Sequence, residues 1–361
     1  MNSIKGKIIN YNESFFGEII FNQNINKINK IETLNNDVII IPGFVDLHCH
    51  GGNGFDTMEG YSSIKEMSNF HLLHGTTTLL PTTWTSGFDN ILKTLKSIDE
   101  LINDEKNNIE GIHLEGPFIN PNKLGAQPAF TQLPSYDFIE NILKDVDIKI
   151  ITLAPEIEGM NEFIDFLINR DIRVQFGHTI ADFKTTNDYL KKYNVGFTHL
   201  YNAMSGHSSR KSGVLSAALL NGKHAEIICD GYHVSEQAIK IAKKCIPGLY
   251  AVSDSISATG LSDGEYNFAG IEIMKKNNMV TIKDSNTLAG SAINMYQSFK
   301  NLIQMSFSYE EAVGMTSYNA AKYLNLNNIG LIKEDKISNF IVLDNNLNLV
   351  DIYFNGEKIN G

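Results

Sequence analysis

The chain has 361 residues, of which 42% are hydrophobic and 20% are charged, and this composition excludes a disordered, collagenous or coiled-coil protein. Its formal net charge of -11 argues against a protein that wraps nucleic acid or coats an anionic membrane. The 3 cysteines include no CxxC pair, so neither a disulfide framework nor a cysteine-rich zinc site is expected. No apolar run approaches the roughly 18 residues of a membrane span, and the first residues lack the pattern of a signal peptide. We therefore expect a soluble, cytoplasmic protein.

Both ends of the chain carry short β-branched stretches separated by turn residues. Residues 4–41 and 336–361 have the pattern of short strands. A small β-sandwich domain built from both termini explains these stretches, with a larger domain inserted between them. We predict this β domain at residues 1–42 and 331–361 and a catalytic domain at residues 43–330.

Between the terminal segments, eight short apolar runs alternate with longer helical segments. The runs cover residues 44–50, 76–83, 109–117, 148–156, 173–179, 196–202, 225–231 and 250–255. The segments between them carry apolar residues at three- and four-residue steps, which is typical of amphipathic helices. Eight strand–helix units over about 250 residues predict a (β/α)8 TIM barrel.

Five of the predicted strands end in side chains that can bind a metal or transfer a proton. They are His48 and His50 on the first strand, Glu115 on the third, His178 on the fifth, His199 on the sixth and Asp254 on the eighth. Catalytic groups of a TIM barrel lie at the carboxyl ends of the strands, so these side chains are expected at one rim. The two-residue period of a strand points His48 and His50 the same way and Cys49 into the opposite layer.

This combination of imidazoles and carboxylates suits Zn²⁺ or Fe²⁺. Glu115 is the natural bridge between one ion at the first-strand histidines and a second ion at the fifth- and sixth-strand histidines. Some two-metal barrels use a carboxylated lysine of the fourth strand as the bridge, but Lys149 lies at the wrong end of that strand. Two such ions generate hydroxide near neutral pH and polarise a carbonyl, which predicts a hydrolase.

Asp254 has the position of a base that takes the water proton and later protonates a leaving group. Its sequence context, Ser-Asp-Ser, is also good helix-capping chemistry, so a helix N-cap is the alternative role. Both roles place the carboxylate at the end of the eighth strand.

Eight longer motifs are spread through most of the chain. They are PGFVDLHCHGG at 42–52, HGTTTLLPT at 74–82, GIHLEGPFINPNKLGAQ at 111–127, GHT at 177–179, THLYNAM at 198–204, CDGYHV at 229–234, SDS at 253–255 and LAGS at 288–291. Together they resemble the N-acetylglucosamine-6-phosphate deacetylases, a family within the amidohydrolase superfamily. The resemblance implies hydrolysis of the acetamido group of N-acetylglucosamine 6-phosphate to glucosamine 6-phosphate and acetate, in amino-sugar catabolism.

The resemblance also assigns roles to the strand-end residues. Glu115, His178 and His199 match the family's metal ligands. Asp254 matches its catalytic aspartate. The first-strand pair of histidines matches only those members that hold two metals, so the resemblance implies one or two divalent ions.

For the substrate, the family pattern assigns contacts to Ala126, Gln127, Asn202, Ala203, Arg210, Asp230, His233, Leu288, Ala289 and Gly290. Arg210 offers a planar fork for phosphate, and in family dimers this arginine reaches the neighbour's site, which implies a homodimer. Glu-Pro usually follows the arginine, whereas this chain has Lys211-Ser212, so its loop is expected to be more flexible. A solvated loop charge is the alternative role for Arg210 and Lys211.

Three alternative functions stay open at this point. One is a deacetylase for N-acetylgalactosamine 6-phosphate, which differs at one hydroxyl. Another is an amidohydrolase that acts on a cyclic amide or a dipeptide and needs no phosphate site. The third is a catalytically silent barrel that serves in an assembly, although such a chain would be expected to lose metal ligands.

Overall fold

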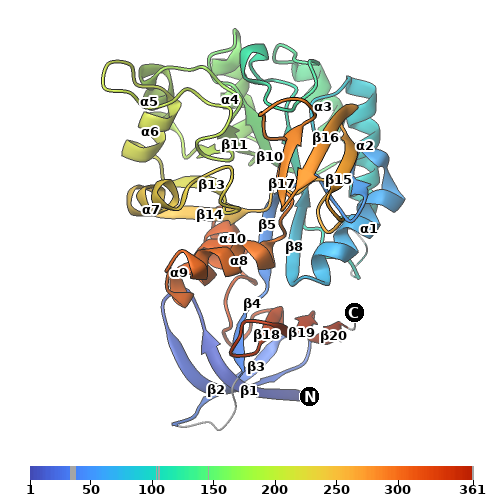
Figure 1. Cartoon of the computed structure of the whole chain (residues 1–361), viewed down its shortest axis with the longest axis vertical. Helices are drawn as coiled ribbons and strands as arrows, with labels where there is room; N and C mark the ends of the chain where they lie inside the picture. Colours follow the sequence, from blue (N-terminus) through green and yellow to red (C-terminus); the bar gives the residue numbers. More distant parts are fainter. Residues whose placement is uncertain (33–37, 103, 105, 145, 360–361) are drawn as a thin grey trace.

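The computed structural model describes residues 1–32, 38–102, 104, 106–144 and 146–359, which form a barrel above a smaller β region (Figure 1). The strands of the β region are β1 Asn2–Ile9, β2 Ser14–Phe21, β3 Ile25–Lys30, β4 Ile39–Pro42, β18 Phe340–Leu343, β19 Leu349–Phe354 and β20 Glu357–Ile359. They pair in the order β20-β19-β18-β4-β1-β2-β3. Strands from both ends of the chain therefore share one sheet, while the exact domain boundaries at 1–42 and 331–361 stay a prediction.

This sheet is folded over on itself. Three strand spacings separate β2 from β18 along the sheet, which is about 14 Å in a flat sheet. The ring centroids of Phe21 and Phe340 are nevertheless only 5.0 Å apart, and those of Phe21 and Tyr353 are 5.2 Å apart. The two halves of the sheet thus enclose a small apolar core, which is the packing of a β-sandwich.

The predicted ring of eight parallel strands is present. Its strands are β5 Phe44–Cys49, β8 Thr76–Pro81, β9 Ile112–Glu115, β10 Ile148–Leu153, β11 Arg173–Phe176, β12 Gly196–Phe197, β13 His224–Ile228 and β14 Gly248–Val252. Parallel ladders join β5 to β8, β9 through β12 in order, and β13 to β14. Isolated backbone hydrogen bonds join the remaining neighbours: Glu110 N to Leu79 O at 3.0 Å, Leu200 N to Glu226 O at 2.9 Å, and Asp254 N to His48 O at 2.9 Å.

The sixth strand is much shorter than predicted. The apolar pattern predicts a strand over 196–202, but β12 ends at Phe197. His199, Tyr201 and Ala203 all have positive φ, at 30°, 83° and 48°, and such a backbone cannot continue a strand. The segment after Phe197 is therefore a turn that carries side chains over the rim.

Helices cover the outside of the strand ring (Figure 1). They are α1 Tyr61–Leu72, α2 Phe88–Ile102, α3 Tyr136–Leu143, α4 Met160–Ile168, α5 Phe183–Lys192, α6 Val214–Asn221, α7 Glu236–Cys245, α8 Met295–Gln304, α9 Tyr309–Val313 and α10 Asn319–Tyr323, with a π-helical turn at Gly314–Tyr318. Smaller elements are β6 Gly51–Gly52, β7 Phe55–Asp56 and the 3-10 turns Thr57–Glu59 and Pro121–Lys123. Within the described residues, no helix has both the length and the apolar character that crossing a membrane requires.

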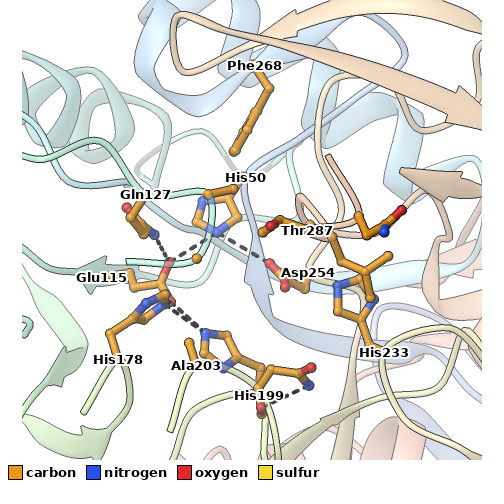
Figure 2. Close-up of a pocket in the computed structure, with 16 residues that line it drawn as sticks. His50, Glu115, Gln127, His178, His199, Ala203, His233, Asp254, Phe268 and Thr287 are labelled. Atoms are coloured by element: carbon orange, nitrogen blue, oxygen red, sulfur yellow. Dashed lines mark hydrogen bonds and ion pairs between the residues drawn. The ribbon is translucent and has the colours of Figure 1, made fainter. Parts of the chain in front are cut away.

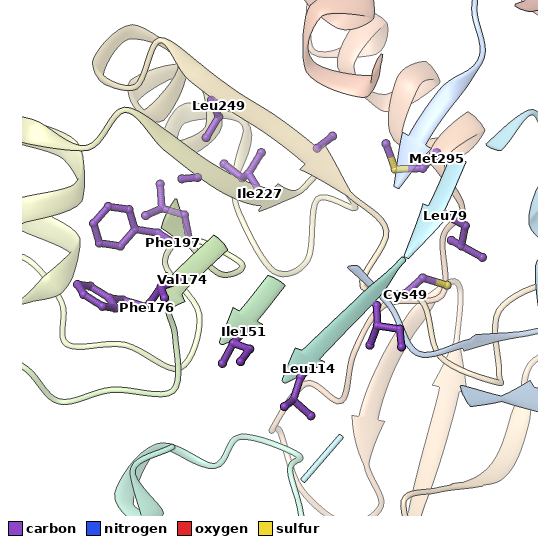
Figure 3. Packing of buried hydrophobic residues seen from close by; sticks show 14 of the residues in the cluster. Cys49, Leu79, Leu114, Ile151, Val174, Phe176, Phe197, Ile227, Leu249 and Met295 are labelled. Atoms are coloured by element: carbon purple, nitrogen blue, oxygen red, sulfur yellow. The ribbon is translucent and has the colours of Figure 1, made fainter. Parts of the chain in front are cut away.

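Outward-facing side chains of the barrel strands form the main core (Figure 3). Leu79, Leu114, Ile151 and Ile227 belong to it and are fully buried, together with Met295 of α8. Burial of one such side chain stabilises the fold by about 1.5–3 kcal/mol. This packing fixes the strand positions and hence the residues at the strand ends.

The amino-terminal end of the barrel is closed by α10. Tyr323 belongs to an interior cluster with Val45, Leu80 and Tyr250, and its ring lies 5.5 Å from that of Tyr250. Side chains therefore fill the lower half of the barrel. The opposite, carboxyl-terminal end is left for a site.

One element was absent from the sequence prediction. A three-stranded antiparallel sheet follows β14 and consists of β15 Gly264–Phe268, β16 Ile271–Lys276 and β17 Met279–Ile282. Several of its side chains are exposed or half-buried, so its strands lack the continuous apolar run of a barrel strand. The sheet places Phe268 beside the carboxyl-terminal rim.

Candidate metal and active site

A cavity of about 320 Å³ opens at the carboxyl ends of the barrel strands. His50, Glu115, His178, His199 and Asp254 converge on it from five different strand ends (Figure 2). His48 lies just beneath them and is fully buried. The structure thus brings together all of the side chains that the sequence places at the metal site and the proposed base.

Three of these residues leave their strands with a left-handed backbone. His178, His199 and Asp254 have φ values of 48°, 30° and 47°. A non-glycine residue in this region costs on the order of 1–3 kcal/mol and persists only where the surrounding structure fixes it. The turns direct the three side chains across the rim instead of along the strands.

Glu115 joins two groups of residues. Its Oε1 lies 3.1 Å from Nε2 of both His178 and His199. Its Oε2 lies 3.2 Å from Nε2 of His50 and 3.6 Å from Nε2 of His48. Each carboxylate oxygen therefore faces a different histidine pair, which is the arrangement of a bridging ligand.

Asp254 belongs to the group around the first-strand histidines. Its Oδ1 is 3.4 Å from His50 Nε2 and 3.5 Å from His48 Nε2. A helix N-cap is the wrong role for it, because the next helix within the described residues, α8, begins at Met295 and is capped by Asn294.

The outer ring nitrogens of three histidines are held by acceptors. His48 Nδ1 lies 2.9 Å from Glu226 Oε2, His50 Nδ1 lies 3.1 Å from Thr82 O, and His178 Nδ1 lies 2.8 Å from Lys123 O. An acceptor requires a hydrogen on Nδ1, so in the neutral ring the lone pair is on Nε2. Such contacts orient the histidines of metal sites.

The inward-facing ring nitrogens of each histidine pair lie close together. Nε2 of His48 is 3.1 Å from that of His50, and Nε2 of His178 is 3.0 Å from that of His199. In the first pair both Nδ1 atoms have acceptors, so two Nε2 lone pairs face each other and repel unless a proton or a metal ion lies between them. The donors form two groups, His48–His50–Asp254 and Glu115–His178–His199, and both fit a divalent transition ion.

The electrostatics of the site agree with this fit. Burial alone would lower the pKa of His50, but Asp254 and Glu115 raise that pKa to about 9. Burial alone would raise the pKa of Asp254, but His48 and His50 lower it to about 2. The site therefore stabilises positive charge between its carboxylates, as a divalent ion would provide.

Gln127 has protein partners in addition to the sugar contact that the resemblance implies. Its Oε1 accepts from the Thr85 N–H at 2.7 Å, and its Nε2 donates to Glu115 Oε2 at 2.5 Å. The side chain lines the cavity, but its amide group supports the bridging carboxylate. The sequence does not predict this bond, because it joins the end of β9 to two loops that meet only in the fold. The sugar contact of Gln127 stays a prediction.

The structure brings most of the other predicted substrate residues to the cavity. Those that line it are Ala126, Asn202, Ala203, His233, Leu288 and Gly290. Asp230 stands behind His233 and accepts from its Nδ1 at 2.7 Å. Ala289 is fully buried in the cluster beneath Phe268.

Arg210 lies away from this cavity. Together with Lys211 it lines a second groove, of about 1130 Å³, beside α5, α6 and α7. The backbone hydrogen bond from Gly213 N to Gly206 O at 3.0 Å closes the loop that carries it. Within one chain the structure therefore does not bring Arg210 to the predicted phosphate site.

Sequence reasoning missed several residues of the site region, among them Phe268 and Glu226, and also Gly125, Asn286 and Thr287 of the cavity wall. Phe268 lines the cavity, with its ring 6.1 Å from that of His50, and nothing in its polar surroundings marks it. Glu226 contacts His48 from the centre of β13. A single carboxylate in the apolar run Ala-Glu-Ile-Ile was a signal that could have found it.

Comparison with known proteins gives a consistent result. Residues 39–359 match the model of the Amidohydrolase family. The chain is 36% identical over 303 residues to N-acetylglucosamine-6-phosphate deacetylase of Bacillus subtilis (strain 168), covering 80% of this chain and 76% of that protein. It is 28% identical over 329 residues to N-acetylgalactosamine-6-phosphate deacetylase of Escherichia coli O157:H7, covering 88% and 87%. One similar solved structure is a mutant N-acetyl-D-glucosamine-6-phosphate deacetylase from Mycobacterium smegmatis in complex with N-acetyl-D-glucosamine-6-phosphate. It matches this chain with a TM-score of 0.92 and 25% sequence identity, and the match covers 99% of this chain and 98% of that chain.

Proposed function

Because the chain belongs to the amidohydrolase family, we propose that it hydrolyses the acetamido group of N-acetylglucosamine 6-phosphate to glucosamine 6-phosphate and acetate, a step of amino-sugar catabolism. The observation that carries the proposal is the convergence of Glu115, two histidine pairs and Asp254 on one cavity. The motif resemblance to this deacetylase family is confirmed by the sequence and structure matches. A phosphorylated sugar does not cross a lipid bilayer unaided, so we place the reaction in the cytoplasm.

In the reaction, a water oxygen attacks the acetyl carbon, the C–N bond breaks, and acetate and the amine leave. One or two divalent ions, Zn²⁺ or Fe²⁺, bound by the two histidine groups would supply Lewis-acid activation of the water and the carbonyl. Asp254 accepts the proton that the water loses and donates it to the departing nitrogen. Phe268 and Leu288 line the cavity and provide apolar surface against the acetyl group and sugar ring.

His233 is the group in this cavity best suited to a substrate oxygen. Burial alone would lower its pKa, but the hydrogen bond from its Nδ1 to Asp230 outweighs burial and raises the pKa. The ring is therefore held in one orientation, with a tendency to carry positive charge. We propose that it donates to a hydroxyl or to the phosphate of the sugar.

The test of the function is acetate release by protein whose metal content has been counted. We expect N-acetylglucosamine 6-phosphate to be hydrolysed far faster than the unphosphorylated sugar. N-acetylgalactosamine 6-phosphate is the second candidate substrate, because one relative bears that name, and kinetics on both epimers separate the two. A metal-loaded protein that releases acetate from none of the three sugars would contradict the proposal.

We propose that a second copy of the chain covers the groove beside α5, α6 and α7. The groove is lined by Leu215, Leu219, Leu220 and Ile241, of which Leu220 is 70% and Ile241 52% exposed. Contiguous apolar surface of this kind marks protein interfaces. Arg210 lies in the same groove, so a homodimer would present it to the neighbouring chain.

Arg210→Ala is expected to raise KM for the phosphorylated sugar by about 10–100-fold, because a charge-assisted hydrogen bond to phosphate contributes about 1.5–3 kcal/mol. The value of kcat should change little. Steady-state acetate release measures both, with Lys211→Ala as the matched loop-cation control. An unchanged KM would leave Arg210 as a solvated loop charge.

Mixed dimers test whether the arginine acts across the interface. An Arg210→Ala chain and an Asp254→Asn chain are co-expressed to form a mixed dimer. In this dimer, the site of the Arg210→Ala chain keeps Asp254 and faces a partner chain that keeps Arg210. If the arginine acts in trans, this site recovers the low KM. If the arginine acts within its own chain, the mixed dimer keeps the high KM of Arg210→Ala.

A further inference from the structure

Glu226 connects the two histidine groups from beneath. It is the central residue of β13, His224–Ile228, and is fully buried. Its Oε2 lies 2.9 Å from Nδ1 of His48 and accepts from the backbone N–H of His199 at 3.2 Å. One oxygen atom therefore contacts a residue from each of the two candidate metal positions.

Stability alone does not explain a carboxylate at this position. Its strand neighbours Ala225, Ile227 and Ile228 are fully buried apolar residues. Taking a carboxylate out of water costs several kcal/mol, and an apolar residue of similar volume in place of a buried ion pair is often neutral or stabilising. What a carboxylate provides here, and an apolar residue would not, is the pair of contacts with His48 and with the backbone of His199.

A separate metal position around Glu226 is excluded by the neighbouring ring. His113 lies in a group with His48 and Glu226. Both of its nitrogens are already used, Nδ1 with Leu47 O at 2.9 Å and Nε2 with Thr152 Oγ1 at 2.7 Å. Oε2 of Glu226 is therefore the atom that contacts both groups, through the ring of His48 and the backbone N–H of His199.

We propose that Glu226 is a positioning residue that holds His48 with its Nε2 toward His50 and Asp254, and so determines whether the ion position at the first strand is filled. A carboxylate on the outer nitrogen fixes the ring and increases the basicity of the inner nitrogen. The other ion position, at Glu115, His178 and His199, receives only a backbone contact from Glu226. This inference rests on the metal dependence of the proposed function.

The test is a titration of metal-free protein with Zn²⁺, followed by calorimetry and by metal counting at a fixed free Zn²⁺ concentration. We expect Glu226→Gln to bind one ion like the wild type and the second about 10–100-fold more weakly. The amide keeps an oxygen acceptor of the same shape, so this variant tests the charge without opening a cavity. Glu226→Ala removes both contacts, so the affinity of this variant for the second ion should fall by at least the same factor.

Asp56→Asn is the matched control, because it neutralises another buried carboxylate whose partners are Met58 N and Trp84 Nε1. It should bind two ions like the wild type. Wild-type affinity at both positions in Glu226→Gln and Glu226→Ala would overturn the inference, and so would a wild-type chain that binds one ion only. A wild type that binds two ions but releases no acetate would contradict the proposed reaction while leaving the role of Glu226 intact.

Discussion

Asp254→Asn is expected to reduce kcat by about 10²–10⁴-fold, which is the usual contribution of a positioned proton-transfer group. Asparagine has almost the same shape, but its amide is too weak a base to accept the water proton. The position of the side chain supports this expectation, since its Oδ1 lies 3.4 Å from His50 Nε2 at the floor of the cavity. Acetate release at saturating substrate measures the effect, and metal counting with thermal unfolding shows whether the rest of the site persists.

Asp56→Asn serves again as the control here, because it removes a buried charge near the cavity without removing a proton acceptor from it. It should retain most of the wild-type kcat. If Asp254→Asn turned over substrate at a near-normal rate with its metal bound, proton transfer by this residue would be excluded.

Glu115→Gln is expected to reduce kcat/KM by at least about 10³-fold. Glu115 contacts both histidine pairs, and removing one member of a group of residues that act together abolishes most of the activity of that group. Its two oxygens face opposite histidine pairs, at 3.1 Å and 3.2 Å, and an amide can offer only one oxygen. The metal content should therefore fall below that of the wild type together with activity. Both are measured on the same preparation by elemental analysis and acetate release.

A carboxylate at a neighbouring strand end provides the control. Glu156 follows β10 and binds the Ile180 N–H and the Thr179 hydroxyl rather than a histidine. Glu156→Gln should keep its metal. Full metal content and activity in Glu115→Gln would show that Glu115 is not a metal ligand.

The sequence predicted the part of this site that depends on local regularity. His48 and His50 point to one centre because a strand has a two-residue period, while Cys49 lies on the other side with its Sγ 3.2 Å from His71 of α1. The barrel was predictable for a similar reason, since each strand leaves an apolar run in the sequence. In such a barrel the carboxyl ends of all strands lie at the same rim, and this does not depend on the conformation of the loops.

What the sequence did not predict depends on contacts between distant segments. The side chain of Gln127 forms hydrogen bonds with Glu115 and with the backbone of Thr85. These residues come together only when the chain folds. Phe268 reaches the cavity on a small antiparallel sheet with partly exposed faces, and such strands leave a weak pattern. Arg210 has the residue type expected for phosphate, but its position in the second groove is set by the packing of its loop.

The order of strands in the terminal sheet has a consequence for how the protein folds during synthesis. β4 pairs with β1 on one side and with β18 on the other, and the side chain of Asn10 bonds both the N–H and the C=O of Ile332, 322 residues later. A ribosome adding about 5–20 residues per second needs on the order of tens of seconds to reach that partner. The edge of β4 that pairs with β18 therefore stays unpaired until the whole barrel has been synthesised. Contacts this distant in sequence slow folding, so the docking of the last strands is the step at which a nascent chain is most exposed to aggregation.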